Sequence, residues 1–189
     1  IDGISLLANN YTSGLLLNPS VQPANVSMNI RLRNMIIRDF TDSGIKINRI
    51  ITSLLENIYC GNCGIGINFV GSTQTSIKLD KCWSLNCKKQ GFLLNTCHYC
   101  ELSNCCCDNC GDVGYHIENC NSIVFNSCGC EVTGKTAFYI KNSLGVVFNG
   151  CLSVNCNNSS SYSDTSCVNI DGSNVTINNI TEKTPANGI

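Results

Sequence analysis

The stretch Ser103–Asn126, SNCCCDNCGDVGYHIENCNSIVFN, carries the pattern that decides the fold. The same kinds of residue return when this stretch is shifted by about 23 residues in either direction. Aligned on Cys105, the matching positions are Met35, Ile58, Cys82, Cys128, Cys151 and Ile180. A fixed period of this size is typical of solenoids, in which each unit buries its apolar face only against its neighbours. The sequence therefore predicts a stack of similar coils.

Each repeat contains three short runs with the alternation of a β-strand. In one repeat these runs are Ile77–Asp80, Cys82–Ser84 and Gly91–Asn95. Apolar and polar residues alternate in the first run, which indicates a strand with one buried face. Three strands in about 23 residues leave no room for a helix, and the crossover rule favours the right-handed form. We therefore expect an all-β, right-handed, single-stranded parallel β-helix of about seven coils.

The repeat pattern covers most of the chain as one domain, residues 1–189. Residues 1–29 form an irregular opening coil and loop, and residues 30–189 form regular coils with a polar insertion at 157–166. The pattern starts and stops inside a repeat, and open solenoid ends expose strand edges and core. We therefore expect the chain to be a fragment of a longer polypeptide.

The composition argues against several classes of protein. The net charge is −1 and only 13% of residues are charged, so no nucleic-acid partner is expected. The sequence has no run of about 18 apolar residues, so no membrane insertion is expected. Sixteen cysteines would suit a secreted disulfide scaffold, but most fall in inward-facing columns where other coils carry Ile, Met, Phe or Thr. We interpret them as reduced core residues of a protein that folds in a cytoplasm.

Chemical motifs are few. Dinucleotide, phosphate-loop and metalloprotease motifs do not occur, and the two histidines, His98 and His116, form no Ser-His-Asp set. Cys60-x-x-Cys63 and Cys107-x-x-Cys110 have zinc-like spacing. The two pairs lie two coils apart, roughly 9–10 Å at the strand spacing, which is too far for one tetrahedral ion. We therefore expect neither a metal nor a cofactor.

Asparagine recurs in two columns of the repeat. Stacked Asn side chains can hydrogen-bond along the axis and tolerate left-handed turn geometry, so these columns predict turn ladders. The columns are Asn62, Asn86, Asn109 and Asn155, with Asp39 at the same place, and Asn34, Asn57, Asn104 and Asn179.

The outward positions supply the candidate site. Glu56 and Asp80 occupy the same outward position in adjacent coils, which places their Cα atoms about 5 Å apart. Tyr59 and Trp83 stack one strand further on. Aromatic rings beside carboxylates suit sugar binding, and paired carboxylates suit acid–base chemistry on glycosides. We predict catalytic roles for Glu56 and Asp80, and substrate binding by Tyr59, Trp83, Arg33 and Glu101. The alternative is an ordinary mixed-charge surface whose two aromatics pack against another chain.

Several outward positions are apolar. An exposed stripe of apolar side chains usually marks an interface, and the repeat predicts that several of these residues lie in adjacent coils. We therefore expect a homotrimer about the helix axis. The residues are Ile36, Leu54, Leu93, Val124, Val147 and Leu152.

The coil length, the Asn ladders, the truncated ends and the Gly-Ile-x-Ile-Asn strands at 44–48 and 64–68 resemble the pectate-lyase-like right-handed β-helices. Within these, the chain most resembles the stems of phage tail spikes and pre-neck appendages. The resemblance implies a trimeric virion appendage that binds, and often degrades, a host surface polysaccharide or teichoic acid. No catalytic motif of the family matches residue by residue, so enzymatic activity stays open. Two other readings remain: a cellular polysaccharide lyase, hydrolase or epimerase of the same fold, and a structural spacer without a ligand.

Overall fold

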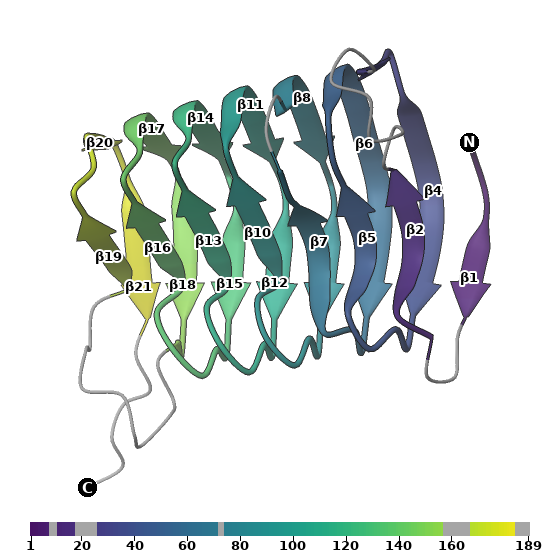
Figure 1. Ribbon diagram of the computed structural model, residues 1–189. Coiled ribbons are helices and arrows are strands. Elements are labelled where there is room, and N and C mark those ends of the chain that lie inside the picture. The colour runs from purple at the N-terminus through teal and green to yellow at the C-terminus, as the bar shows by residue number, and fades with distance from the viewer. Residues whose placement is uncertain (8–10, 18–25, 72–73, 157–166, 184–189) are drawn as a thin grey trace, which may run out of the picture.

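The computed structural model describes residues 1–7, 11–17, 26–71, 74–156 and 167–183. Over these residues the chain is all-β, without a helix, and coils into a parallel β-solenoid (Figure 1). The solenoid has about five turns at a spacing of about 23 residues. The predicted fold class is confirmed. The expected seven coils are slightly too many, because strands of incomplete coils at both ends continue the sheets. No helix in the described part of the chain is long and apolar enough to cross a membrane.

Two parallel sheets form the walls of the solenoid. The larger sheet has fourteen strands: β1 (Ser5–Leu7), β3 (Ser27–Met28), β4 (Arg31–Arg38), β6 (Ile50–Gly61), β8 (Gln74–Asp80), β9 (Trp83–Leu85), β11 (Cys97–Ser103), β12 (Cys106–Asp108), β14 (Asn121–Asn126), β15 (Gly129–Glu131), β17 (Leu144–Asn149), β18 (Cys151–Val154), β20 (Val175–Ile177) and β21 (Ile180–Lys183). The smaller sheet has seven: β2 (Ser13–Leu17), β5 (Ser43–Ile47), β7 (Ile65–Phe69), β10 (Phe92–Asn95), β13 (Tyr115–Glu118), β16 (Phe138–Lys141) and β19 (Val168–Asp171).

The three predicted runs of each repeat are distributed over these two sheets. The first and second runs both belong to the larger sheet, where β4 and β6 pass through the bend between them without a break. The third run belongs to the smaller sheet. Within residues 1–29, β1 pairs with β4 and β2 pairs with β5, so the opening residues extend both sheets. Residues 18–25, within the predicted opening coil and loop, and the predicted insertion at 157–166 lie outside the described residues.

Left-handed backbone conformation marks the bends of each coil. Both predicted Asn columns contain such residues, among them Asn34 and Asn57 in one and Asn62 and Asn86 in the other. Their side chains form the expected ladders: Asn57 Nδ2 donates to Asn34 Oδ1 at 2.7 Å, and Asn62 Nδ2 donates to Asp39 Oδ1 at 2.9 Å. Asn tolerates this conformation because its short polar side chain can hydrogen-bond locally.

Two further bends per coil have the same conformation without an asparagine signature. Thr, Ser, Tyr and Arg occupy many of these positions, which is why the sequence pattern did not single them out. One column contains Asn29, Thr52, Ser76, Tyr99 and Ser122, and the other contains Arg49, Thr96, Asn119 and Asn142.

Aromatic side chains stack inside the solenoid along the axis. The Phe92, Tyr115 and Phe138 rings are nearly parallel, with centroid separations of 4.8 and 5.0 Å. Phe125 and Phe148 stack in the same way at 4.7 Å. The buried Tyr115 hydroxyl lies 2.9 Å from the carbonyl oxygens of both Cys105 and Gly129, so it always has an acceptor. Identical register from coil to coil produces this stacking.

All sixteen cysteines are free thiols, and thirteen of them are buried. The predicted burial of most cysteines in the core is confirmed. The Cys105 thiol donates to the Leu79 carbonyl at 3.6 Å, and Cys128 donates to Leu102 at 3.3 Å, so the column also hydrogen-bonds to the preceding coil. Burial raises the pKa of the Cys60 and Cys130 thiols, because a thiolate is poorly solvated in this interior.

Candidate functional site

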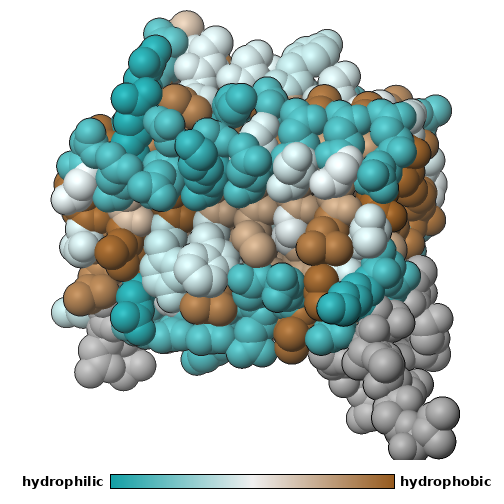
Figure 2. Space-filling view, turned by 180° about the vertical axis from the view of Figure 1, so that it is seen from behind, coloured by the Kyte–Doolittle hydropathy of each residue, from teal (hydrophilic) through white to brown (hydrophobic). Residues whose placement is uncertain are grey.

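One outward column of the larger sheet contains both candidate aromatic residues. The register pairs Ile36 with Tyr59, Tyr59 with Trp83, and Trp83 with Cys106, as the repeat predicted. The column continues through Gly129 and Leu152. Figure 2 views this side of the molecule, where a band of apolar and aromatic residues runs along the axis between rows of hydrophilic residues.

Tyr59 and Trp83 form an edge-to-face pair, with ring centroids 5.4 Å apart and an interplanar angle of 72°. The Tyr59 ring lies over Gly61, where an added Cβ would come within 2.5 Å of the Tyr59 hydroxyl. Trp83 is 41% exposed. Its Nε1–H donates to Asp108 Oδ2 at 2.6 Å, which holds the indole toward the next coil. We call this pair the aromatic platform.

Asp108 is a site residue that sequence reasoning missed. It lies in the outward column next to that of Trp83, because β12 pairs with β9 and places Asp108 beside Leu85. Leu85 and Glu131 occupy the equivalent positions in the two adjacent coils, so this column carries no uniform signal in the sequence. The Asp108 carboxylate also accepts from the Cys106 thiol at 3.1 Å, through Oδ1. Asp108 is therefore tied to two neighbours and positions the indole.

The two candidate catalytic carboxylates are register neighbours, as predicted, with Glu56 opposite Asp80. They are held by different partners. Glu56 Oε2 pairs with Arg33 Nε at 3.0 Å, in the preceding coil. Asp80 Oδ1 accepts from Asn104 Nδ2 at 3.2 Å, in the following coil. The contacts draw the two carboxylates in opposite directions along the axis, and their catalytic role stays a prediction.

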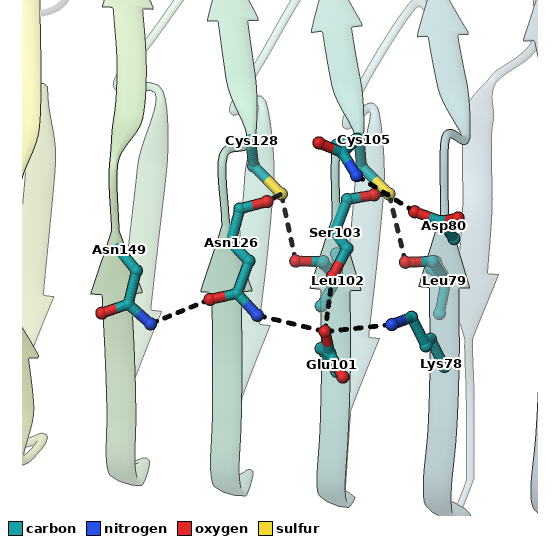
Figure 3. Close-up of polar contacts among 11 residues, drawn as sticks. Lys78, Leu79, Asp80, Glu101, Leu102, Ser103, Cys105, Asn126, Cys128 and Asn149 are labelled. Atoms are coloured by element: carbon teal, nitrogen blue, oxygen red, sulfur yellow. Dashed lines mark hydrogen bonds and ion pairs between the residues drawn. The ribbon is translucent and has the colours of Figure 1, made fainter.

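Glu101 is the centre of a separate polar network, drawn in Figure 3. Its Oε1 accepts from Lys78 Nζ at 3.2 Å, Ser103 Oγ at 2.5 Å and Asn126 Nδ2 at 3.1 Å. The Ser103 hydrogen bond, followed by the contacts to Lys78 and Asn126, lowers the pKa of Glu101 despite some burial. A hollow of about 400 Å³ lies beside the network; it is lined by Tyr99, Cys100, Glu101, Ser122, Val124 and Asn126. Glu101 is thus a carboxylate held by three hydrogen-bond partners, on a patch separate from the aromatic platform.

The smaller sheet has a shallow groove of about 560 Å³ that the sequence analysis did not predict. Its floor contains His116 and Tyr139, which are register neighbours on β13 and β16. Burial lowers the pKa of His116, so the imidazole is neutral at pH 7. The sequence signal was weak: only His116 and Tyr139 stand out in a third-strand column that otherwise reads Lys46, Asn68, Leu93 and Asn169. The groove is lined by Gln90, Asp112, Val113, His116, Lys135, Tyr139, Asn169, Ile170 and Asp171.

The six apolar residues expected to form a stripe belong to three different columns. Val124 and Val147 are neighbours, but Lys78 and Glu101 separate them from Leu54. Leu93 lies on the smaller sheet, opposite His116 on β13. Only Ile36 and Leu152 are highly exposed, at 45% and 40%. The residues therefore make scattered apolar spots and one short pair instead of a continuous stripe.

Among the described residues, no group of three or more His, Cys, Asp or Glu side chains could hold a metal ion. The parallel β-solenoid is consistent with the pectate-lyase-like architecture that the sequence resembles. Neither protein-family models nor curated proteins give a match to the chain. The functional argument therefore rests on the geometry of the outward faces.

Proposed function

We propose that the chain binds a host cell-surface polysaccharide or teichoic acid along the aromatic platform, as the β-helical part of a phage tail spike or related virion appendage. The observation that carries the proposal is the Tyr59–Trp83 pair, which is partly exposed on a regular sheet between charged rows. Aromatic rings supply a large apolar surface for a sugar ring at a small cost in conformational entropy.

The surroundings of the platform support recognition of a polar polymer. Arg33 and Glu56 lie on one side, and Asp108 lies on the other. Carboxylates accept hydrogen bonds from sugar hydroxyls, and a guanidinium can donate to an anionic group such as a phosphodiester. The coils repeat every ~4.8 Å along the axis, so the same face is suited to an extended chain lying along the solenoid.

The contacts of the two carboxylates favour binding over cleavage at this site. An acid–base pair acts on one glycosidic bond from the two sides of that bond. Glu56 and Asp80 instead point to partners in opposite coils. A spike that binds through this region and cleaves elsewhere, or that only binds, agrees better with these contacts than a hydrolase centred on Glu56 and Asp80.

Assembly and location are part of the same proposal. A homotrimer would bring three platforms to one appendage and raise the avidity for a repetitive polymer. The buried free thiols suit folding in a reducing cytoplasm before assembly into the virion. If Trp83 or Tyr59 packs against a sister chain, the platform is a subunit interface. That result would favour a structural spacer over a sugar-binding protein.

The test compares two variants of the full-length protein with the unchanged protein. One variant is Trp83→Ala, and the other combines Trp83→Ala with Asp80→Asn. We expect Trp83→Ala to weaken binding to host cell-wall polymer by about tenfold, because one stacked ring is removed. Tyr11→Ala is the matched control, because Tyr11 is an exposed aromatic at 72% and lies outside the platform.

Unchanged polymer binding in both Trp83 variants, with an intact oligomer by light scattering, would refute the proposal. Loss of the oligomer would show that the platform is an interface between copies of the chain. Gly61→Ala gives an independent check, because the new methyl group must displace the Tyr59 ring. It should weaken binding without removing either aromatic side chain.

A further inference from the structure

The groove on the smaller sheet has an ordered, three-coil construction. Its floor follows the outward column His116, Tyr139 and Asn169, one residue from each of β13, β16 and β19. These strands lie side by side on the near side of the solenoid in Figure 1. The His116 and Tyr139 rings meet edge to face with centroids 5.0 Å apart. The floor of the groove therefore consists of one aromatic pair, His116 with Tyr139, followed by the Asn169 side chain.

One wall of the groove is a polar ladder in the turns that precede the strands. Gln90 Nε2 donates to Asp112 Oδ2 at 3.0 Å, and Asp112 Oδ1 pairs with Lys135 Nζ at 2.9 Å. Gln90, Asp112 and Lys135 come from three successive coils. Each is held by its neighbour, so the wall has a fixed shape before any ligand binds. Such preorganisation reduces the entropy cost of binding.

The other side of the groove carries a second row of charges. Asp171 lines the groove and is the register neighbour of Lys141, whose ammonium pairs with Glu118 at 3.2 Å. The Glu118 carboxylate also lies 3.6 Å from His116 Nε2. That nitrogen is buried and has no hydrogen-bond partner within the described residues.

The charges of the lining select the chemistry of the ligand. Asp112 and Asp171 are opposed by one ammonium, Lys135, and His116 is neutral at pH 7. The groove is therefore slightly acidic, which disfavours a phosphate or a uronate. Carboxylate, amide and imidazole groups around an aromatic floor match a ligand with many neutral hydroxyls.

We propose that this groove is a second binding site, specific for a short stretch of neutral sugar or amino-sugar residues. It shares no residue with the aromatic platform and lies on the other sheet. The proposal therefore holds or fails independently of polymer binding at Trp83. Both sites have more carboxylates than cations: Glu56, Asp80 and Asp108 outnumber Arg33 at the platform, and Asp112 and Asp171 outnumber Lys135 in the groove. The two sites are therefore distinguished by their lining residues and not by the sign of their charge.

The sequence provides a separate reporter for each site. It has one tryptophan, Trp83, and two histidines, His98 and His116. His116 lines the groove, whereas His98 lies on β11 of the larger sheet beside Asn121. Tryptophan fluorescence therefore reports on the platform. The imidazole proton signals in NMR report on the groove, with His98 as an internal control.

The experiment titrates the 189-residue chain, in which these reporters are unique, with tetramers of glucose and of N-acetylglucosamine, and with poly(glycerol phosphate) as an anionic probe. We expect a saturable shift of the His116 signals with at least one neutral tetramer, no comparable shift of His98, and no His116 response to the anionic polymer. Tyr139→Ala should weaken this binding by about tenfold, whereas Tyr139→Phe should retain it, because the ring face makes the contact.

Asp112→Asn is a second variant that keeps the shape of the wall while removing its pairing charge with Lys135. It should weaken binding of the neutral tetramer and allow a response to the anionic polymer. The proposal is overturned if neither tetramer shifts His116, if His98 shifts equally, or if poly(glycerol phosphate) shifts His116 as strongly as the sugars do. A fluorescence change at Trp83 without a His116 shift would support the platform and refute the groove.

Discussion

The inward and outward columns of the same strands follow different rules. Inside, the column Cys82, Cys105, Cys128 and Cys151 repeats one residue type, and Phe92, Tyr115 and Phe138 repeat one shape. Outside, one column changes from the positive Arg33 to the negative Glu56 and Asp80 and then to the neutral Ser103. Parallel stacking places each residue on its own equivalent, so the interior must keep its volume constant while the exterior is free to vary. Stability should therefore depend on inward positions, and function on outward ones.

The largest effect is expected in the aromatic column. Tyr115→Ala removes a fully buried ring between Phe92 and Phe138. We expect a loss of about 3–5 kcal/mol in the free energy of unfolding, measured by urea denaturation. Tyr115→Phe keeps the ring and loses only the hydroxyl hydrogen bond, so it should cost about 1 kcal/mol. An equal cost for the two variants would show that the stacked rings are not the source of stability.

A second inward column, which contains Cys60, Ser84, Cys107 and Cys130, should make the protein sensitive to alkali. Burial raises the pKa of Cys60, Cys107 and Cys130 above the ordinary 9.0 of a thiol. Folded thiols keep their protons where unfolded ones lose them, so this stability is complete below pH 9 and falls as pH rises above it. Urea denaturation at about pH 7 and about pH 10 should show the loss, and Cys130→Ala should reduce it.

Thiol titration gives the matching chemical check on all the cysteines. With denaturant and without reductant, most of the sixteen cysteines should react as free thiols. Six or more disulfides would contradict both the structure of the interior and the argument for a reducing compartment.

A smaller, opposite effect is expected at a bend. Val132 has a left-handed backbone conformation, with φ of 53°, and is 39% exposed. A β-branched residue is unfavourable in this conformation, so Val132→Asn should stabilise the protein by about 1 kcal/mol. The new asparagine would also fill the gap between Asn109 and Asn155 in the Asn column. Val124→Asn, at a half-buried strand position, is the control and should destabilise; a destabilised Val132→Asn would contradict the explanation.

The smallest effect is expected at the outward ion pair. Arg33 and Glu56 are both partly exposed to solvent, so Arg33→Gln should change the free energy of unfolding by about 0–1 kcal/mol. The same change should weaken binding to an anionic wall polymer more than binding to a neutral one. A loss of stability as large as that of Tyr115→Ala would remove the distinction between inward and outward columns.

The Asn ladders show how far the sequence predicts detail. The predicted left-handed bends are confirmed at every position of the two columns except Asn179, because Asn is one of the few residues that both adopts this geometry and can hydrogen-bond to the equivalent side chain one coil away. The bends at Thr52, Ser76 and Thr96 have the same conformation without that signature. There the packing of the coil imposes a conformation that the residue type does not reveal.

The sequence by itself determined the period, the parallel strands, the register of Glu56 with Asp80 and of Tyr59 with Trp83, and the burial of the cysteines. These follow from which positions repeat, because every coil must fit on the one before it. Only the tertiary structure decided the partners of the outward side chains. Asp108 holding Trp83, Glu56 turning to Arg33, and the walls around His116 depend on side-chain directions across neighbouring coils. A repeat fixes which residues are neighbours, but rotamers and local charge decide which of those neighbours make contact.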